Sequence, residues 1–196
     1  MTNKIYALFG PHASGKTTLV KHLQKMGIHY IPQYTTRVPG NVSSDPAIYN
    51  FISKIDFFKK DFLIKTTNQG NYYGLLKQDI LGSIQEYPIT VCIADANAVK
   101  QLAKLIKGNF ESIFVMVDYV TLIERMLKLG HTNNEIKANI EYAENNGEFD
   151  NWKIATHIIK NVSSEQKALS QLLSIMGLME PIPNEKLKKF TERIVK

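Results

Sequence analysis

Residues Gly10–Thr17 read GPHASGKT and directly follow the short apolar run KIYALF. They satisfy the pattern G-x-x-x-x-G-K-[ST]. The apolar run predicts a buried strand over Ile5–Phe9, and the apolar spacing after the loop predicts a helix over Lys16–Lys25. A strand, a glycine-rich loop and a helix N-terminus, in this order, form the context in which the pattern binds phosphate.

The chemistry of this loop follows from its backbone. Glycines let the chain fold around an anion with its N–H groups pointing inward, and the helix N-terminus adds a partial positive charge. Lys16 can then reach the β- and γ-phosphates of a nucleotide, and the hydroxyl of Thr17 can bind Mg²⁺. An ordinary glycine turn is the alternative, but with Gly at about 7% of residues the pattern arises by chance at only roughly a few in 100,000 positions. The sequence therefore predicts a nucleotide phosphate site made of Gly10, Pro11, His12, Ala13, Ser14, Gly15, Lys16, Thr17 and Thr18.

Apolar runs alternate with helical patterns along most of the chain. The runs predict strands at Ile5–Phe9, Ile28–Ile31, Ile89–Ala94, Ile113–Val117 and His157–Ile159. The helical patterns predict helices at Lys16–Lys25, Leu76–Glu86, Ala98–Ile106, Val120–Leu129, Asn134–Asn145 and Ser164–Ile175. Strands joined by crossover helices form a parallel sheet covered on both faces, so we predict a three-layer α/β/α protein. Ligands of such folds bind at the carboxyl ends of the strands, where Gly10 and Asp95 fall.

Two segments break the alternation of strands and helices. Residues 33–74 are rich in Thr, Asn, Gly and Tyr, with short apolar alternation in YNFIS and FLIKT, which predicts a small, mostly β insertion that binds substrate. Residues 129–147 are polar and contain a glycine near each end, which predicts a mobile helical lid. The expected core of this single folded unit is then residues 1–32, 75–128 and 148–178. An amphipathic terminal helix is predicted in the extension over residues 179–196, after its two prolines.

The charge of the chain is positive but diffuse. The formal net charge is +6 and the isoelectric point about 9.2. A nucleic-acid surface requires a concentrated basic stripe with aromatic residues between the cations, and the sequence has none, so we expect no nucleic-acid partner. The densest basic run, Lys186–Lys189, is typical of the solvated face of the terminal helix.

Cysteine and histidine usage excludes two classes of site. Cys92 is the single cysteine, which rules out an intramolecular disulfide and a thiolate metal cluster. Its surroundings, ITVCIAD, predict a small core residue in a buried strand. The five histidines lack metal-ligand spacing. Because the chain shows no signal peptide and no apolar run near ~20 residues, we expect a cytoplasmic monomer or homodimer without membrane contact.

Several motifs, in order and at similar spacing, resemble the guanylate kinase family from about Ile5 to Ile175. The phosphate loop continues as GPHASGKTTL, and TTRVP at Thr35–Pro39 is similar to the T-T-R-x-P segment of the family. IYNF resembles its D-Y-x-F segment, and GNYYG at Gly70–Gly74 its tyrosine turn. LIERMLKLG resembles the helix that leads to its lid. This resemblance implies transfer of the γ-phosphoryl group of ATP to GMP, giving ADP and GDP, with Mg²⁺ as cofactor and small-molecule nucleotides as partners.

The resemblance also implies roles for individual residues. Arg37, Tyr49 and Tyr73 would bind the acceptor phosphate, because arginine binds phosphate at two points and tyrosine donates a hydrogen bond. Arg125 would bridge donor and acceptor phosphates. Asp95 would contact the acceptor base or organise Mg²⁺ through water. Each has a structural alternative: a loop ion pair for the first arginine, simple packing for the tyrosines, a solvated helix face for Arg125 and a helix cap for Asp95.

The chain departs from the family pattern at positions that concern the acceptor. The glutamate that reads guanine falls on Ile64, and a serine after the tyrosine turn falls on Leu75. A carboxylate accepts hydrogen bonds from both guanine N–H groups, whereas Ile64 accepts none, at a cost of about 1–3 kcal/mol for each donor left unpaired. Gln33 is a candidate to read the base through its amide. Further altered positions, comprising one serine, one aspartate, the second acceptor arginine and two lid arginines, are Gln33, Ile48, Gly40, Leu129 and Asn139.

Three hypotheses follow from these observations. The first is a divergent guanylate kinase or a close nucleoside-monophosphate kinase. The second keeps the ATP site but phosphorylates another acceptor, such as a ribose phosphate or a modified nucleotide, although the tyrosine turn argues against it. The third is a non-catalytic guanylate kinase-like binding module, against which the intact Lys16 and Thr17 argue.

Overall fold

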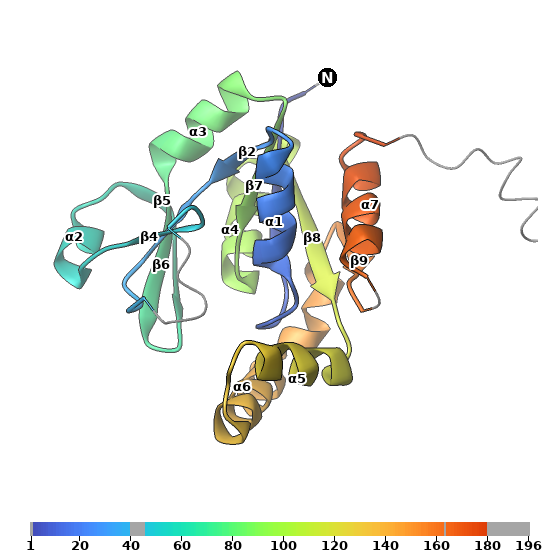
Figure 1. The fold of residues 1–196 in the computed structure, drawn as a ribbon. Coiled ribbons are helices and arrows are strands. Elements are labelled where there is room, and N and C mark those ends of the chain that lie inside the picture. Colours follow the sequence, from blue (N-terminus) through green and yellow to red (C-terminus); the bar gives the residue numbers. More distant parts are fainter. Residues whose placement is uncertain (1, 40–45, 163, 180–196) are drawn as a thin grey trace, which may run out of the picture.

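The computed structural model describes residues 2–39, 46–162 and 164–179 of the chain. Its central sheet has the strand order β2-β7-β1-β8-β9, and every neighbouring pair in it is parallel (Figure 1). The strands are β1 (Lys4–Phe9), β2 (His29–Ile31), β7 (Ile89–Ile93), β8 (Phe110–Met116) and β9 (His157–Lys160). Because β1 is the middle strand, the loop that follows it lies at the centre of the carboxyl edge of the sheet.

Helices connect these strands, and side-chain caps fix where several of them begin. They are α1 (Lys16–Lys25), α3 (Lys77–Glu86), α4 (Ala96–Leu105), α5 (Tyr119–Lys128), α6 (Asn133–Asn145) and α7 (Glu165–Ile175), with short 3-10 helices η1 (Lys107–Asn109) and η2 (Glu148–Ile154). Asp118 caps α5 by accepting a hydrogen bond from the backbone N–H of Thr121 at 2.7 Å. Thr132 and Glu135 cap α6 as a reciprocal pair. Such caps satisfy backbone N–H groups that have no partner within the helix.

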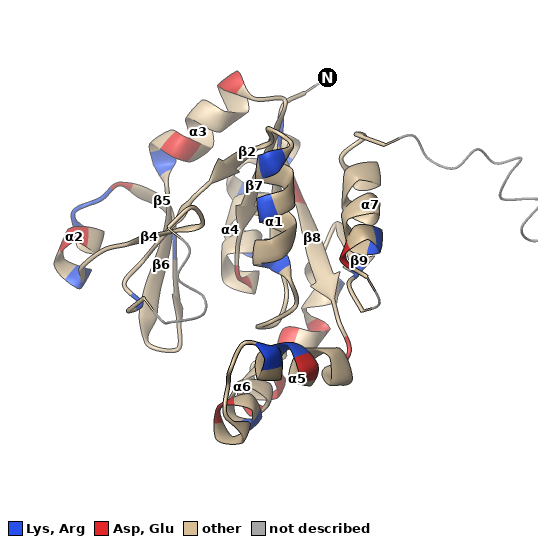
Figure 2. Ribbon diagram, in the orientation of Figure 1, with Lys and Arg blue, Asp and Glu red and all other residues tan. Residues whose placement is uncertain are grey.

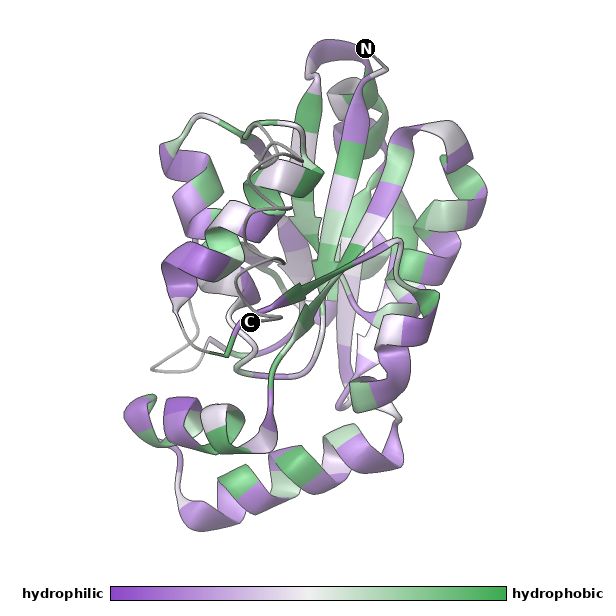
Figure 3. Cartoon of the chain, turned by 90° about the vertical axis from the view of Figure 1, so that its right-hand side faces the viewer, coloured by the Kyte–Doolittle hydropathy of each residue, from purple (hydrophilic) through white to green (hydrophobic). Residues whose placement is uncertain are grey.

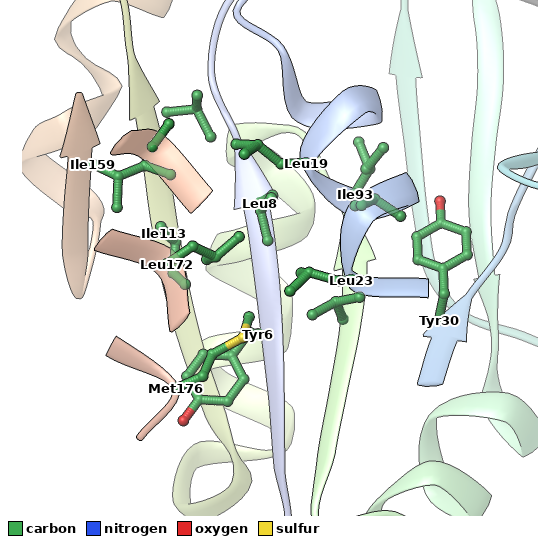
Figure 4. Packing of buried hydrophobic residues seen from close by; sticks show 14 of the residues in the cluster. Tyr6, Leu8, Leu19, Leu23, Tyr30, Ile93, Ile113, Ile159, Leu172 and Met176 are labelled. Carbon is green, nitrogen blue, oxygen red and sulfur yellow. The ribbon is translucent and has the colours of Figure 1, made fainter. Parts of the chain in front are cut away.

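The core has two halves because β1 alternates its side chains between the faces of the sheet. Tyr6 and Leu8 face α1 and α7, where they pack with Leu19, Leu23 and Leu172 (Figure 4). On the opposite face the cluster contains Ile5, Ala7, Phe9, Ile80, Val99 and Leu102, which join β1 to α3 and α4. Figure 3 shows hydrophobic residues running along the strands of this sheet, while the covering helices carry hydrophilic residues as well. The sheet is therefore the middle of three layers, as the sequence predicts.

The insertion is a second, smaller sheet with the order β4-β3-β6-β5 (Figure 1). Its strands are β3 (Gln33–Thr35), β4 (Tyr49–Phe51), β5 (Phe62–Asn68) and β6 (Asn71–Leu76), with the short helix α2 (Lys54–Phe58) between β4 and β5. Gln69 and Gly70 both have positive φ, 46° and 75°, which is the requirement of a two-residue hairpin turn. The turn sets the register that pairs Thr66 with Tyr73. The prediction of a mostly β insertion is confirmed.

The predicted strands and helices of the core are also confirmed, with ends that differ by a few residues. The fourth core strand is predicted over Ile113–Val117 but begins earlier, at Phe110, in register with β1. The helix predicted from Ala98 begins at Ala96, because Asp95 caps it. Helix α2 and the two 3-10 helices were not predicted, since segments this short have no detectable apolar period. The predicted terminal helix and position 40 lie outside the described residues.

Surface charge is mixed in sign over the described residues. Figure 2 shows lysine and arginine interspersed with aspartate and glutamate on the helices. Within residues 2–39, 46–162 and 164–179, no helix combines the length and the apolar character needed to cross a membrane. Cys92 is fully buried in β7, as predicted, and burial raises the pKa of its thiol to about 12.

Candidate active site

A cavity of about 770 Å³ lies where the phosphate loop, the insertion and the segment around α6 meet. Predicted donor-side residues that line it are Gly10, His12, Ala13, Gly15, Lys16, Thr17 and Thr18. From the insertion and the core come Gln33, Arg37, Tyr49, Tyr73, Asp95 and Arg125. Of the predicted site residues, only Pro11 and Ser14 do not line the cavity; both are buried in the loop. The structure thus brings donor and acceptor candidates to one opening.

Two glycines are required by the shape of the loop. Gly10 has φ 144°, and a Cβ atom there would lie 2.8 Å from the carbonyl oxygen of Val115. Gly15 has φ 98°, and a Cβ atom there would lie 2.3 Å from the side-chain nitrogen of Asn161. A larger residue at Gly10 would have to displace the backbone of β8, and one at Gly15 would have to displace the side chain of Asn161. Steric contacts therefore explain why the phosphate-binding pattern has glycine at both positions.

Lys16 lies inside the loop that it completes. Its ammonium group donates hydrogen bonds to the carbonyl oxygens of Gly10 and Pro11, each at 2.8 Å, and to the hydroxyl of Ser14 at 3.2 Å. Burial lowers the pKa of Lys16 to about 8, and the carboxylate of Glu148 opposes this shift. The charge is held by weak neutral acceptors, which a phosphate group can replace.

Arg125 is hydrogen-bonded to the phosphate loop and is not a freely solvated side chain. Its guanidinium donates to the carbonyl oxygen of Ser14 at 3.0 Å and to that of Asn161 at 2.8 Å. The side-chain amide of Asn161 donates to the same Ser14 oxygen at 2.8 Å. The alternative of a solvated helix face is therefore wrong for Arg125. These bonds fix a cation beside the loop, and its role in transfer stays a prediction.

The three predicted acceptor-phosphate residues lie together. The guanidinium carbon of Arg37 is 5.5 Å from the ring centre of Tyr49 and 5.8 Å from that of Phe51. Burial raises the pKa of both Tyr49 and Tyr73, and the charge of Arg37 opposes each shift. Tyr49 and Thr17 of the phosphate loop line the same cavity, so the acceptor side faces the donor loop. One cation and two neutral phenol groups thus face a common space, which suits an anion.

Asp95 has a structural use as well as a place in the cavity. One of its oxygens accepts a hydrogen bond from the backbone N–H of Ala98 at 2.8 Å and so caps α4. The other accepts a short hydrogen bond from the hydroxyl of Thr66 in β5. The cap interpretation is therefore correct, and contact with a base or with hydrated Mg²⁺ stays a prediction. The hydrogen bonds of Asp95 therefore connect α4 of the core with β5 of the insertion, beside the cavity.

Two positions that depart from the family pattern, Ile64 and Leu75, are buried in the core. Ile64 and Leu75 pair across β5 and β6, and both are buried in the core cluster under α3 and α4. Neither lines the cavity. Polar side chains at this end of the cavity come instead from Gln33, which is buried, and from Asn68. At the two positions where the family has polar residues, this chain therefore offers no hydrogen-bonding side chain to the cavity.

Sequence reasoning did not single out several residues that line the cavity. Asn161 directly follows β9, so the rule that selected Asp95 at the end of a strand could have selected it too. Tyr142 of α6 donates a hydrogen bond to the side-chain oxygen of Asn68 at 2.9 Å, which joins the lid segment to the insertion. Glu148 also lines the cavity, although no sequence pattern singled it out. Burial raises the pKa of its carboxyl group, and the positive charge of Lys16 opposes this shift.

The strand order, the glycine loop after the middle strand and the paired anion-binding groups define a P-loop nucleotide kinase fold. The guanylate kinase family model matches residues 2–177, so the chain belongs to the guanylate kinase family. It is 26% identical over 188 residues to a guanylate kinase of Bartonella henselae, covering 93% of this chain and 83% of that protein. It is 29% identical over 134 residues to a guanylate kinase of Helicobacter pylori, covering 65% of each.

A crystal structure of guanylate kinase from Anaplasma phagocytophilum has a similar fold. The superposition has a TM-score of 0.66 and covers 91% of this chain and 88% of that one, at 18% sequence identity. At this identity the likeness concerns the fold. It agrees with the family assignment made from sequence.

Proposed function

We propose that the protein transfers the γ-phosphoryl group of ATP to GMP or dGMP, giving ADP and GDP or dGDP. The observation that carries the proposal is the single cavity lined both by Lys16 of the phosphate loop and by Arg37, Tyr49 and Tyr73. Phosphoryl transfer depends mainly on aligning two anions and neutralising their oxygens, and this cavity has one anion-binding group of residues for each.

The donor end would be held by the backbone of the loop and by Lys16. The loop winds through two glycines with positive φ, Gly10 and Gly15, as a cradle of inward-pointing N–H groups requires. The hydroxyl of Thr17 lines the same cavity and would bind Mg²⁺, which would neutralise the donor phosphates. Lys16 would leave its carbonyl partners for the phosphate oxygens, since charge-assisted hydrogen bonds are the stronger ones.

The acceptor phosphate would be held by Arg37 and the two tyrosine hydroxyls. One of its oxygens attacks the γ-phosphorus in line, and the bond from that phosphorus to the bridging oxygen of ADP breaks. The attacking oxygen carries negative charge already, so no general base is needed. Arg125, fixed beside Ser14, would neutralise charge on the moving group.

The lid would keep water out during transfer. Residues Leu129, Glu135, Asn139 and Tyr142 line the cavity from the lid segment. The contact from Tyr142 to Asn68 links this segment to the insertion across the opening. Exclusion matters because water would otherwise accept the phosphoryl group.

An acceptor panel tests the proposal. The protein is mixed with ATP, Mg²⁺ and one of GMP, dGMP, AMP, CMP, UMP or a ribose bisphosphate, and the products are separated. We expect diphosphate with GMP or dGMP, and Lys16→Ala should reduce its formation at least about 100-fold. Lys25→Ala is a matched control, because Lys25 is exposed on the same helix and does not line the cavity. No diphosphate from any nucleotide would overturn the proposal.

A second acceptor class is favoured by one observation. Ile64 and Leu75 offer no hydrogen-bond acceptor to guanine, and their side chains are buried outside the cavity. Turnover of ATP with a sugar phosphate, and with no nucleoside monophosphate, would decide for that class. Failure to bind ATP with Mg²⁺ in calorimetry would point to the non-catalytic binding module.

The remaining assignments are part of the same proposal. We infer that residues 33–74 bind the acceptor, that residues 129–147 act as a lid, and that residues 1–32, 75–128 and 148–178 form the catalytic core. This division is supported by the cavity, to which all three parts contribute. We further propose a cytoplasmic monomer or homodimer, which light scattering and cell fractionation would test.

A further inference from the structure

Two histidines that are far apart in the sequence meet beside the phosphate loop. His12 is the third residue of the loop, and His131 lies between α5 and the cap of the lid helix α6. Their Nε2 atoms are 3.4 Å apart, and the planes of the two rings are perpendicular. Both side chains line the cavity. A ligand in the cavity can therefore contact one histidine from the donor loop and one from the lid segment.

The charges around His12 suit an anion. Its side chain opens to solvent through the cavity, yet the surrounding protein atoms still disfavour its charged form, and this desolvation is the main reason that its pKa is lowered to about 4. The positive charges of Lys16, His131 and Arg37 add to the lowering. Negative charge bound among these groups would offset their mutual repulsion. An anion is therefore the class of ligand that the pair favours.

His12 lies between the two anion-binding groups of the cavity. Lys16 completes the loop that would hold the donor phosphates, whereas Arg37 belongs to the group that would hold the acceptor phosphate. All three side chains line one cavity, and the charges of both cations act on His12. In phosphoryl transfer, the terminal phosphoryl group of the donor has to face the acceptor oxygen, so it must lie between these two groups.

The hydrogen bonding of the pair also favours an oxyanion. A hydrogen bond between two imidazoles uses one N–H and one lone pair, whichever ring donates. Phosphoryl oxygens only accept, so each ring can donate an Nε2–H to them. Hydrogen bonds to an ionised group are roughly twice as strong as those between neutral groups. Exchange of the histidine–histidine bond for two bonds to phosphate is therefore favourable.

We propose that His12 and His131 bind the terminal phosphoryl group of the donor nucleotide, one from the phosphate loop and one from the lid segment, and so distinguish ATP from ADP. This inference rests on the ATP site of the proposed function and adds two side chains to it. ADP lacks the terminal phosphoryl group, so its binding needs neither histidine. The nucleotide would join the lid segment to the loop only while the transferable group is present.

Calorimetry of ATP and of ADP with Mg²⁺, without any acceptor, tests this inference. His12→Ser and His131→Asn should each weaken ATP binding about 10-fold or more, because a hydrogen bond to a charged group is lost. ADP binding should stay near that of the unchanged protein. His29→Asn is the matched control, because His29 stacks on Tyr87 and does not line the cavity. It should bind both nucleotides as the unchanged protein does.

Retained ADP binding also shows that the loop of each variant is folded. An equal loss of ATP and ADP affinity would mean that the histidines only hold the lid segment against the loop, and an unchanged ATP affinity would mean that they do not contact the phosphoryl group. Either result overturns this inference alone. An unchanged protein that binds no ATP would overturn it together with the proposed donor site. Because no acceptor is present, the result does not depend on which acceptor the protein uses.

A second measurement follows the imidazole of His12 directly. In an NMR titration its pKa should rise when ATP binds, because a nearby negative charge favours the protonated ring, and it should rise less with ADP. The carboxylate of Glu135, 4.0 Å from Nδ1 of His131, faces the other ring and is present with either nucleotide. The same pKa of His12 with ATP as without it would contradict the contact.

Discussion

The ammonium group of Lys16 is held by two carbonyl oxygens of its own loop. This arrangement keeps a charge in a desolvated position, and burial lowers the pKa of Lys16 to about 8 from the usual 10.5. Because the folded pKa lies below the unfolded one, the buried charge reduces stability below about pH 8. This penalty fades as the pH rises from 8 toward 10.5.

Nucleotide binding should therefore take up a proton in alkaline solution. Phosphate oxygens beside Lys16 favour its charged form and raise its pKa, so at pH 9 the complex holds a proton that the free protein has partly lost. We expect proton uptake and falling ATP affinity above pH 8, measured by calorimetry in buffers of different ionisation enthalpy. At pH 6.5 Lys16 is charged in both states and should contribute no uptake. Equal proton balance at the two pH values, or the same uptake in Lys16→Ala, would contradict this assignment.

Tyr72 and Tyr73 are neighbours on β6 that have different surroundings. Tyr73 lines the cavity near Arg37, whereas the ring of Tyr72 packs on Phe57 and Phe58 in the small core of the insertion. If Tyr73 binds the acceptor phosphate as we propose, Tyr73→Phe removes a hydrogen bond to a charged group, so KM for the acceptor should rise about 10-fold or more. KM for ATP should hardly change.

Tyr72→Phe is the matched control for that experiment, since it removes the same atom from the other side of the strand. It should leave both KM values near those of the unchanged protein. A similar rise of the acceptor KM in both variants would mean that the tyrosines act by packing alone.

At the scale of elements, caps determine where helices begin and thereby which side chains face the core. Ser164 accepts a hydrogen bond from the backbone N–H of Lys167 at 3.2 Å and starts α7. Helix α7 then buries Ala168 and Leu172 against the central sheet (Figure 4). Removing the cap should therefore also weaken the packing of α7 against the central sheet.

Ser164→Ala should lower the free energy of unfolding by about 1 kcal/mol, the usual effect of removing an N-cap side chain. Ser170→Ala provides the comparison, because Ser170 is exposed in the interior of the same helix, where alanine has the higher helix propensity. It should be neutral or slightly stabilising. Urea unfolding measures the free energy of unfolding of both variants. Equal decreases in the two variants would show that the side chain of Ser164 does not act as a cap.

At the scale of the whole molecule, Cys92 reports on the integrity of the central sheet. It lies in β7 between two other strands, with no exposed surface, and burial raises its thiol pKa to about 12. The thiolate is the reactive form, so a native molecule should react with a thiol reagent only after opening. We expect slow labelling without denaturant, rapid labelling of one thiol in urea, and free cysteine as the reference. Fast labelling of the native protein would show that the sheet opens locally.

Most of the fold and much of the candidate site could be predicted from local sequence patterns. The phosphate loop and the alternating strands and helices could be predicted from short stretches of sequence. Strands and helices each give a characteristic spacing of apolar residues within such a stretch. Gly10 and Asp95 could be placed at the cavity because the middle of a parallel sheet is a general ligand position. Gln33, Arg37, Tyr49, Tyr73 and Arg125 came from resemblance, and the structure brings all of them to the same cavity.

The sequence alone determined a parallel α/β core with a phosphate loop, because neighbouring residues set turns, caps and apolar periods. Tertiary structure decided which distant side chains meet. His12 and His131 are 119 positions apart, and Asn68 and Tyr142 are 74 apart, so no local pattern links either pair. Packing of the elements also decided that Ile64 and Leu75 belong to the core and not to the cavity, since both lie in the buried cluster under α3 and α4. Side-chain proximity of this kind depends on how whole elements pack, and that is a property of the folded chain.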